Sequence, residues 1–140
     1  MPKRERDALA QVPLFQTLAP RHLRRIADLT REERIMEGAA VVTEGEEGDT
    51  FYVILEGEAK VQSRSGRVVN SLRPGDFFGE ISLLDGGPRT ATVSAETPMT
   101  VLTLARRDFL KMLRAEPQVA VKLLSYIATL LRRLERSPSG

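Results

Sequence analysis

Residues 78–93 read FGEISLLDGGPRTATV, and this stretch is the most informative one for predicting the fold and function of the chain. Gly79 has no Cβ and lets the backbone approach a ligand closely. The first free N–H groups of a helical turn at residues 81–83 attract an anion, and Arg89 offers a planar fork of donors to phosphate oxygens. Glu80 is unfavourable beside a phosphate unless it accepts a hydrogen bond from a hydroxyl, such as that of a ribose. The combination indicates a nucleotide whose phosphate and ribose hydroxyl lie close together.

The stretch resembles the phosphate-binding cassette of the cyclic-nucleotide-binding domains, which occur in catabolite activator proteins, cyclic-nucleotide-dependent kinases and cyclic-nucleotide-gated channels. Residues 78–84 and 88–93 match the two parts of the family pattern, FGE[LI][AS]L[LI] and PR[STA]A[TS]V, at nearly every position. A second block, EGEEGDTFYVILEGEAKV at residues 44–61, looks like the family's strand–turn–strand element. The resemblance covers roughly residues 14–134.

The resemblance implies a mainly β fold with flanking helices. Its centre would be an eight-stranded antiparallel β-roll, jelly-roll-like, with an N-terminal helical bundle and C-terminal hinge and lid helices. We expect a single domain over residues 1–140. Its parts would be N-terminal helices in 1–30, the β-roll with its cassette in 31–105, C-terminal helices in 106–135 and a polar tail in 136–140.

Glycines at roughly ten-residue intervals independently indicate an all-β centre, because turns every 8–12 residues between short β-branched runs are typical of sandwiches and barrels. These glycines are Gly38, Gly48, Gly57, Gly66, Gly75 and Gly86. The runs before, between and after them are predicted strands, at residues 34–36, 41–43, 51–55, 59–63, 68–72, 90–95 and 99–104.

Helices are predicted on both sides of the strands. Residues 20–29 and residues 117 to about 134 each begin with proline, which is tolerated in the first helical turn. Residues 106–114 place their apolar side chains on one face.

The resemblance assigns ligand contacts to the cassette residues Phe78, Gly79, Glu80, Ile81, Ser82, Arg89, Thr90 and Ala91. Structural alternatives exist for the central ones. Arg89 could be a surface arginine that ends a loop, Glu80 a carboxylate that caps the helix dipole, and Gly79 part of a tight turn. Ser82 would contribute its backbone N–H, with its hydroxyl optional.

Thr90 bears on the choice of base. In the family, a hydroxyl directly after the phosphate arginine can reach the amino group of a syn guanine. Thr or Ser there accompanies cGMP preference in the kinases and Ala accompanies cAMP preference, yet several bacterial and channel relatives with a hydroxyl still prefer cAMP. Thr90 could also bond locally at a strand edge. We expect cAMP to be slightly favoured over cGMP.

The last predicted helix carries two apolar lines. One has coiled-coil spacing and consists of Ala120, Leu124, Ile127, Leu131 and Leu134. The other consists of Val119, Leu123, Tyr126 and Leu130. Either one line meets a second copy in a homodimer, or both lines fold onto their own domain. Tyr126, Arg132 and Arg133 are candidate lid residues by resemblance, although a solvated arginine pair that balances the helix dipole fits equally well.

Enzymatic alternatives have less support. The β-roll is shaped like a cupin, whose metal sites use two or more histidines with a carboxylate, whereas His22 is the single histidine here. We expect His22 to be exposed on its helix, and we expect no metal site and no catalytic residues. A ligand-free interaction module is a further alternative, against which the intact Gly79, Glu80 and Arg89 argue. We therefore expect a regulatory sensor whose C-terminal helices move on binding.

Composition fits this interpretation. The net charge is +2 and the short basic runs are broken by acids, so we expect no nucleic-acid binding. Zero cysteines, no apolar run of about 20 residues and a polar N-terminus predict a cytoplasmic chain without a membrane span or signal peptide. The expected ligand is cAMP or cGMP, with no other cofactor, and the downstream protein partner or fused effector is unknown. Met1 favours a natural beginning, for either a free-standing sensor or a module of a longer protein.

Overall fold

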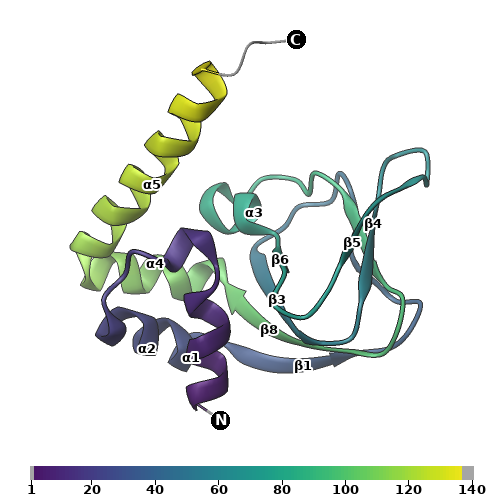
Figure 1. Ribbon diagram of the computed structural model, residues 1–140, viewed down its shortest axis with the longest axis horizontal. Helices are drawn as coiled ribbons and strands as arrows, with labels where there is room; N and C mark the ends of the chain where they lie inside the picture. Colours follow the sequence, from purple (N-terminus) through teal and green to yellow (C-terminus); the bar gives the residue numbers. More distant parts are fainter. Residues whose placement is uncertain (1, 137–140) are drawn as a thin grey trace.

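The computed structural model describes residues 2–136. Its centre is a β-roll of two four-stranded antiparallel sheets, with helices gathered at one end (Figure 1). The first sheet has the strand order β1-β8-β3-β6 and the second the order β2-β7-β4-β5. This arrangement confirms the mainly β fold with flanking helices.

The bounds of the elements are as follows. The strands are β1 (Arg31–Ile35), β2 (Ala40–Val42), β3 (Thr50–Glu56), β4 (Ala59–Gln62), β5 (Val68–Leu72), β6 (Phe77–Phe78), β7 (Thr92–Ala95) and β8 (Met99–Ala105). The helices are α1 (Pro2–Ala10), α2 (Pro20–Leu29), α3 (Glu80–Asp85), α4 (Arg106–Ala115) and α5 (Pro117–Arg136), with a 3-10 turn η1 (Pro13–Phe15).

The first sheet separates two hydrophobic clusters, so β3 and β8 are buried on both faces. Successive side chains of a strand point to opposite faces. Phe51 and Val53 therefore pack toward the helices, whereas Ile54 packs between the two sheets. Continuous apolar runs in the sequence are the signature of such a doubly covered strand.

The helix-side cluster joins α1, α2, α4 and the first half of α5 to the roll. Val119 and Leu123 of α5 are buried in it. Beyond them α5 extends away from the roll, and α3 lies between the roll and α5 (Figure 1). Helix α5, which is one of the helices predicted to move on binding, is therefore packed against the roll only through its first half.

Most elements lie where the sequence predicts them. Helix α2 spans the predicted residues 20–29, and α4 and α5 exceed their predicted C-terminal ends by one or two residues. Sequence patterns do not locate α1, which is mostly polar and fully buries only Leu9 among its described side chains, or β6, which is two residues long. Both lack a periodic pattern long enough to recognise.

Candidate functional site

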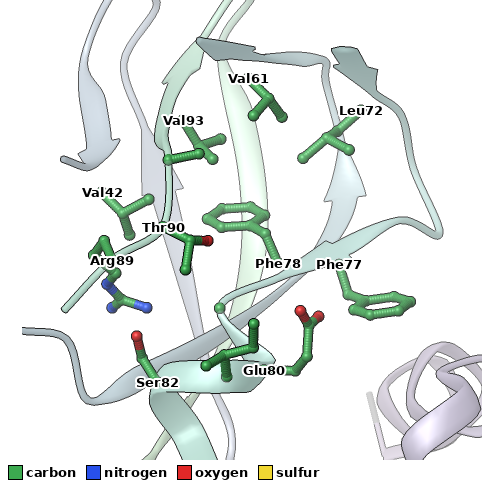
Figure 2. Close-up of a pocket in the computed structure, with 13 residues that line it drawn as sticks. Val42, Val61, Leu72, Phe77, Phe78, Glu80, Ser82, Arg89, Thr90 and Val93 are labelled. Carbon is green, nitrogen blue, oxygen red and sulfur yellow. The ribbon is translucent and has the colours of Figure 1, made fainter. Parts of the chain in front are cut away.

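A pocket of about 180 Å³ opens where β6 leads into α3. One side is apolar and is formed by Val42, Val61, Leu72, Phe78 and Val93. The polar lining residues are Glu80 and Ser82 on α3, and Arg89 and Thr90 on the segment across the pocket from α3 (Figure 2). The pocket therefore combines charged groups with a hydrophobic wall.

Every residue that the sequence assigns to ligand contact lines this pocket, including Ile81 and Ala91. The three candidate lid residues do not. Tyr126 is partly buried against the helix-side cluster, and α5 carries Arg132 and Arg133 away from the roll (Figure 1). Their lid role stays a prediction.

The guanidinium of Arg89 is held from two sides. Its Nη1 donates a hydrogen bond to the carbonyl oxygen of Thr50 at 2.9 Å. Its Cζ lies 5.8 Å from the centre of the Tyr52 ring, a cation–π distance, and that ring stacks on Phe78 with centroids 4.8 Å apart. Because a guanidinium has five N–H donors, this support leaves donors for an anion in the pocket.

Two glycines make room for Arg89. A Cβ on Gly48 would overlap its Nε atom, and a Cβ on Gly79 would lie 2.9 Å from Nη1 and 2.7 Å from the Thr50 carbonyl oxygen. Gly79 also has a φ of 88°, which other residues rarely adopt. The packing of the protein itself therefore requires glycine at position 79, as would the close approach of a ligand.

Sequence reasoning misses the supporting role of Gly48, Thr50 and Tyr52. The interpretation of residues 44–61 as a strand–turn–strand element says nothing of a contact with the cassette. In the structure this block pairs with the cassette, because Arg89 N donates to Glu46 O at 2.8 Å. The signal in the sequence is Gly48, which lies in the second family-like block and outside the cassette that contains Arg89.

Helix α3 is capped by glycines at both ends, with Gly79 and Gly86 at φ values of 88° and 69°. The Ser82 hydroxyl donates to the Gly87 carbonyl at 3.1 Å, and Gly86 N donates to Ser82 O at 2.8 Å. The hydroxyl of Ser82 thus closes the loop after α3. Its backbone N–H belongs to the first turn, where helical N–H groups have no intrahelical acceptor.

Glu80 lies at the start of α3 with its carboxylate on the pocket side, near Phe77 and Phe78 (Figure 2). Burial raises the pKa of this carboxyl above its ordinary value, while its own backbone N–H opposes the increase. A carboxylate in this position can accept a hydrogen bond from a hydroxyl, which would lower the cost of its burial.

Thr90 and Ala91 follow Arg89 along the opposite rim of the pocket. The hydroxyl of Thr90 points into the pocket in Figure 2. Thr92, by contrast, accepts a hydrogen bond from Glu44 N at 3.0 Å and serves the fold.

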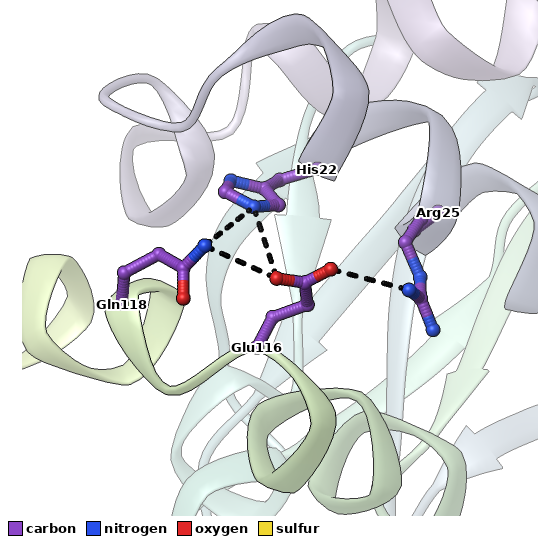
Figure 3. A network of polar contacts seen from close by, with 4 residues as sticks. All are labelled: His22, Arg25, Glu116 and Gln118. Atoms are coloured by element: carbon purple, nitrogen blue, oxygen red, sulfur yellow. Dashed lines mark hydrogen bonds and ion pairs between the residues drawn. The ribbon is translucent and has the colours of Figure 1, made fainter.

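The expectation of an exposed His22 was wrong, because its side chain is 2% exposed. It lies on the face of α2 that also buries Ile26, one helical turn further on. Its Nε2 lies 3.6 Å from Glu116 Oε2, and Arg25 Nη1 lies 3.2 Å from Glu116 Oε1 (Figure 3). Neighbouring arginines in the sequence suggested exposure, but they occupy other faces of the helix.

Within residues 2–136 the structure contains no cluster of three or more metal-ligating side chains. Over the same part of the chain, no helix has the length and apolar character needed to cross a bilayer.

Fold and site together define a β-roll that offers an arginine, a carboxylate and a glycine-capped helix to one small pocket. The sequence model of the family described as "Cyclic nucleotide-binding domain" matches residues 32–116. The chain therefore belongs to the cyclic-nucleotide-binding domain family.

Three similar proteins illustrate the range of this family. A cAMP-dependent protein kinase regulatory subunit from Yarrowia lipolytica is 41% identical over 75% of this chain and 28% of its own length. A cyclic nucleotide-gated potassium channel from Mesorhizobium japonicum is 38% identical over 80% of this chain and 31% of its own. The N-terminal domain of a transcriptional regulator from Streptomyces coelicolor A3(2) has a TM-score of 0.86 and 34% identity, and each chain is covered to 95%. The chain thus spans roughly a third or less of the kinase subunit and of the channel.

Proposed function

We propose that this protein binds a cyclic nucleotide in the pocket between α3 and the segment 89–91, and that cAMP is slightly preferred over cGMP. The observation that carries the proposal is the convergence of Gly79, Glu80 and Arg89 on one pocket. Arg89 would bind the cyclic phosphate together with first-turn N–H groups of α3. Glu80 would accept the ribose hydroxyl.

The size of the pocket bears on which parts of the nucleotide it would enclose. Its volume of about 180 Å³ is below the roughly 300–1,000 Å³ that is usual for ligand pockets. The phosphate and ribose would occupy the enclosed part, and the base would project from the mouth beside Thr90. The proposed function is binding without chemical conversion.

Calorimetric titration with cAMP and cGMP tests this proposal, with AMP and GMP as linear controls. Saturable binding of a cyclic nucleotide and no binding of the linear ones would support it. Absence of binding of either cyclic nucleotide at high micromolar concentration would overturn it and favour the ligand-free interaction module.

Thr90→Ala tests the base preference. If the hydroxyl contributes only to guanine recognition, the variant should bind cAMP as the wild type does and bind cGMP about fivefold more weakly, the loss of one hydrogen bond. A weaker affinity for cAMP in the variant would show that the Thr90 hydroxyl also contributes to cAMP binding and would contradict a role in guanine recognition alone.

The proposed signal passes from α3 to the C-terminal helices. Leu83 of α3 is fully buried in the same cluster as Phe109 and Leu123, and Arg106 Nη2 donates to Leu84 O at 3.2 Å. A displacement of α3 would therefore disturb α4 and α5. A ligand that prefers the displaced state 100-fold would contribute about 2.7 kcal/mol.

A homodimer through α5 is a further part of the proposal. Leu124, Leu131 and Leu134 of the predicted seam are 65%, 56% and 71% exposed. Such exposed apolar side chains are expected on a helix that packs against a second copy in a dimer. Sedimentation equilibrium should show a concentration-dependent dimer that Leu124→Ser/Leu131→Ser abolishes. A monomer at all concentrations would contradict this part and leave the nucleotide site unaffected.

A further inference from the structure

A second hollow, of about 630 Å³, lies on the side of α4. Its lining is strongly basic and consists of Asp49, Gly86, Arg106, Arg107, Leu110, Lys111 and Arg114. It shares no residue with the pocket around Arg89. We call it the α4 hollow.

Three cations of the α4 hollow form a stripe along the helix. Arg107, Lys111 and Arg114 are spaced i, i+4, i+7, which places them on one face. All three are exposed, and among residues 2–136 none of them has an ion pair with a carboxylate. Like charges at this spacing destabilise a helix by a few tenths of a kcal/mol per pair. An anionic partner would remove that cost.

Arg106 forms a fixed wall of the hollow. Its backbone N donates to Asp49 O at 2.7 Å and its Nη2 donates to Leu84 O, whereas its buried Nε has no hydrogen-bond partner. Gly86 lies against the guanidinium, since a Cβ there would be 3.4 Å from Cζ. The wall is therefore held in place before any partner arrives.

The composition of the hollow selects among anions. The stripe extends about 10 Å along the helix axis, which is too long for a single phosphate to span. Leu110 offers an apolar contact that an apolar peptide side chain can cover and a phosphate backbone cannot. In an extended peptide, alternate side chains lie about 7 Å apart on one side, close to the spacing of successive cations in the stripe.

We propose that the α4 hollow binds an extended acidic segment of a partner protein, with Asp or Glu at alternate positions and an apolar residue among them. The carboxylates would pair with the stripe and with Arg106, and the apolar side chain would cover Leu110. The argument for this segment does not rest on the proposed binding of a nucleotide.

A labelled peptide of alternating Glu and Gly with one central Leu tests the proposal by fluorescence anisotropy with the 140-residue chain. We expect the triple variant Arg107→Gln/Lys111→Gln/Arg114→Gln to bind at least about tenfold more weakly than wild type at low salt. The matched control neutralises three exposed arginines elsewhere, Arg31→Gln/Arg34→Gln/Arg67→Gln, and should bind like wild type. Circular dichroism establishes that both variants are folded.

Four results would overturn the proposal. These are equal binding by the two triple variants, no binding of the peptide at low salt, tighter binding of single-stranded DNA of the same charge, and full competition by millimolar inorganic phosphate. The last two would reassign the hollow to a nucleic acid or to a small anion. A peptide with Gln in place of Glu should fail to bind.

Discussion

The pocket around Arg89 and the outer half of α5 differ in how fully the domain satisfies their side chains. Arg89 rests on the Thr50 carbonyl and the Tyr52 ring, in a space that two glycines keep open. Leu124 and Leu134, by contrast, remain largely exposed. The roll thus fixes the position of the Arg89 side chain without a ligand, whereas the outer half of α5 keeps apolar side chains exposed that a further contact could cover.

The largest expected effect concerns the preformed region. Arg89→Ala removes two or more charge-assisted hydrogen bonds of about 1.5–3 kcal/mol each, so cAMP affinity should fall about 1,000-fold. Arg67→Ala, which removes an exposed arginine far along the roll, serves as control and should bind normally. Calorimetry gives both affinities, and wild-type affinity of Arg89→Ala would refute the site.

Two neighbouring leucines allow the buried and exposed faces of α5 to be compared directly. Leu123 is 3% exposed and Leu124 is 65% exposed. Leu123→Ala should lower the free energy of unfolding by about 2–4 kcal/mol, and Leu124→Ala by less than about 0.5 kcal/mol. Urea denaturation at low protein concentration, where a dimer would dissociate, measures both. Equal losses would mean that both apolar lines fold onto the domain.

A pair of glycines tests the support of the arginine. Gly48→Ala should displace the Arg89 side chain and weaken cAMP binding about tenfold, a loss of about 1.4 kcal/mol. Gly38 has a φ of 86° with nothing within 4 Å of an added Cβ. Gly38→Ala should therefore cost about 1 kcal/mol of stability through backbone strain and leave affinity unchanged. If Gly48→Ala binds like wild type, Arg89 needs no preformed cradle.

The smallest expected effect is a pH dependence of binding. Burial raises the pKa of Glu80, so this carboxyl takes up its proton at a higher pH than an exposed glutamate. Affinity for cAMP should be full above that pKa and fall severalfold as the pH drops through it, because protonation removes the charge that strengthens the hydrogen bond accepted from the ribose hydroxyl. Glu80→Gln should bind with a flatter pH profile, and an unchanged profile would exclude Glu80 as the titrating group.

The contribution of Glu80 to the stability of the unliganded protein should depend on pH in the opposite direction. The folded state binds the Glu80 proton more tightly than the unfolded chain does. The contribution of Glu80 to stability therefore becomes more favourable as the pH falls through its raised pKa. Comparing wild type with Glu80→Gln by denaturation at several pH values isolates this contribution.

The sequence predicts features that depend on residues close together in the chain better than contacts between distant segments. The cassette is contiguous, so the sequence pattern alone is enough to assign its residues to one pocket. The contacts of Gly48 and Thr50 with Arg89 join segments about 40 residues apart, and local patterns do not report such packing. His22 likewise lies against a residue that is distant in the sequence, Glu116 at the junction of α4 and α5.

Backbone amide NMR spectra recorded during a cAMP titration map both the proposed binding in the pocket around Arg89 and the proposed response of the C-terminal helices. We expect the largest shifts at residues 79–82 and 89–91, with smaller shifts in α4 and α5. Shifts confined to other surfaces, or no shifts in excess cAMP, would refute the proposed site.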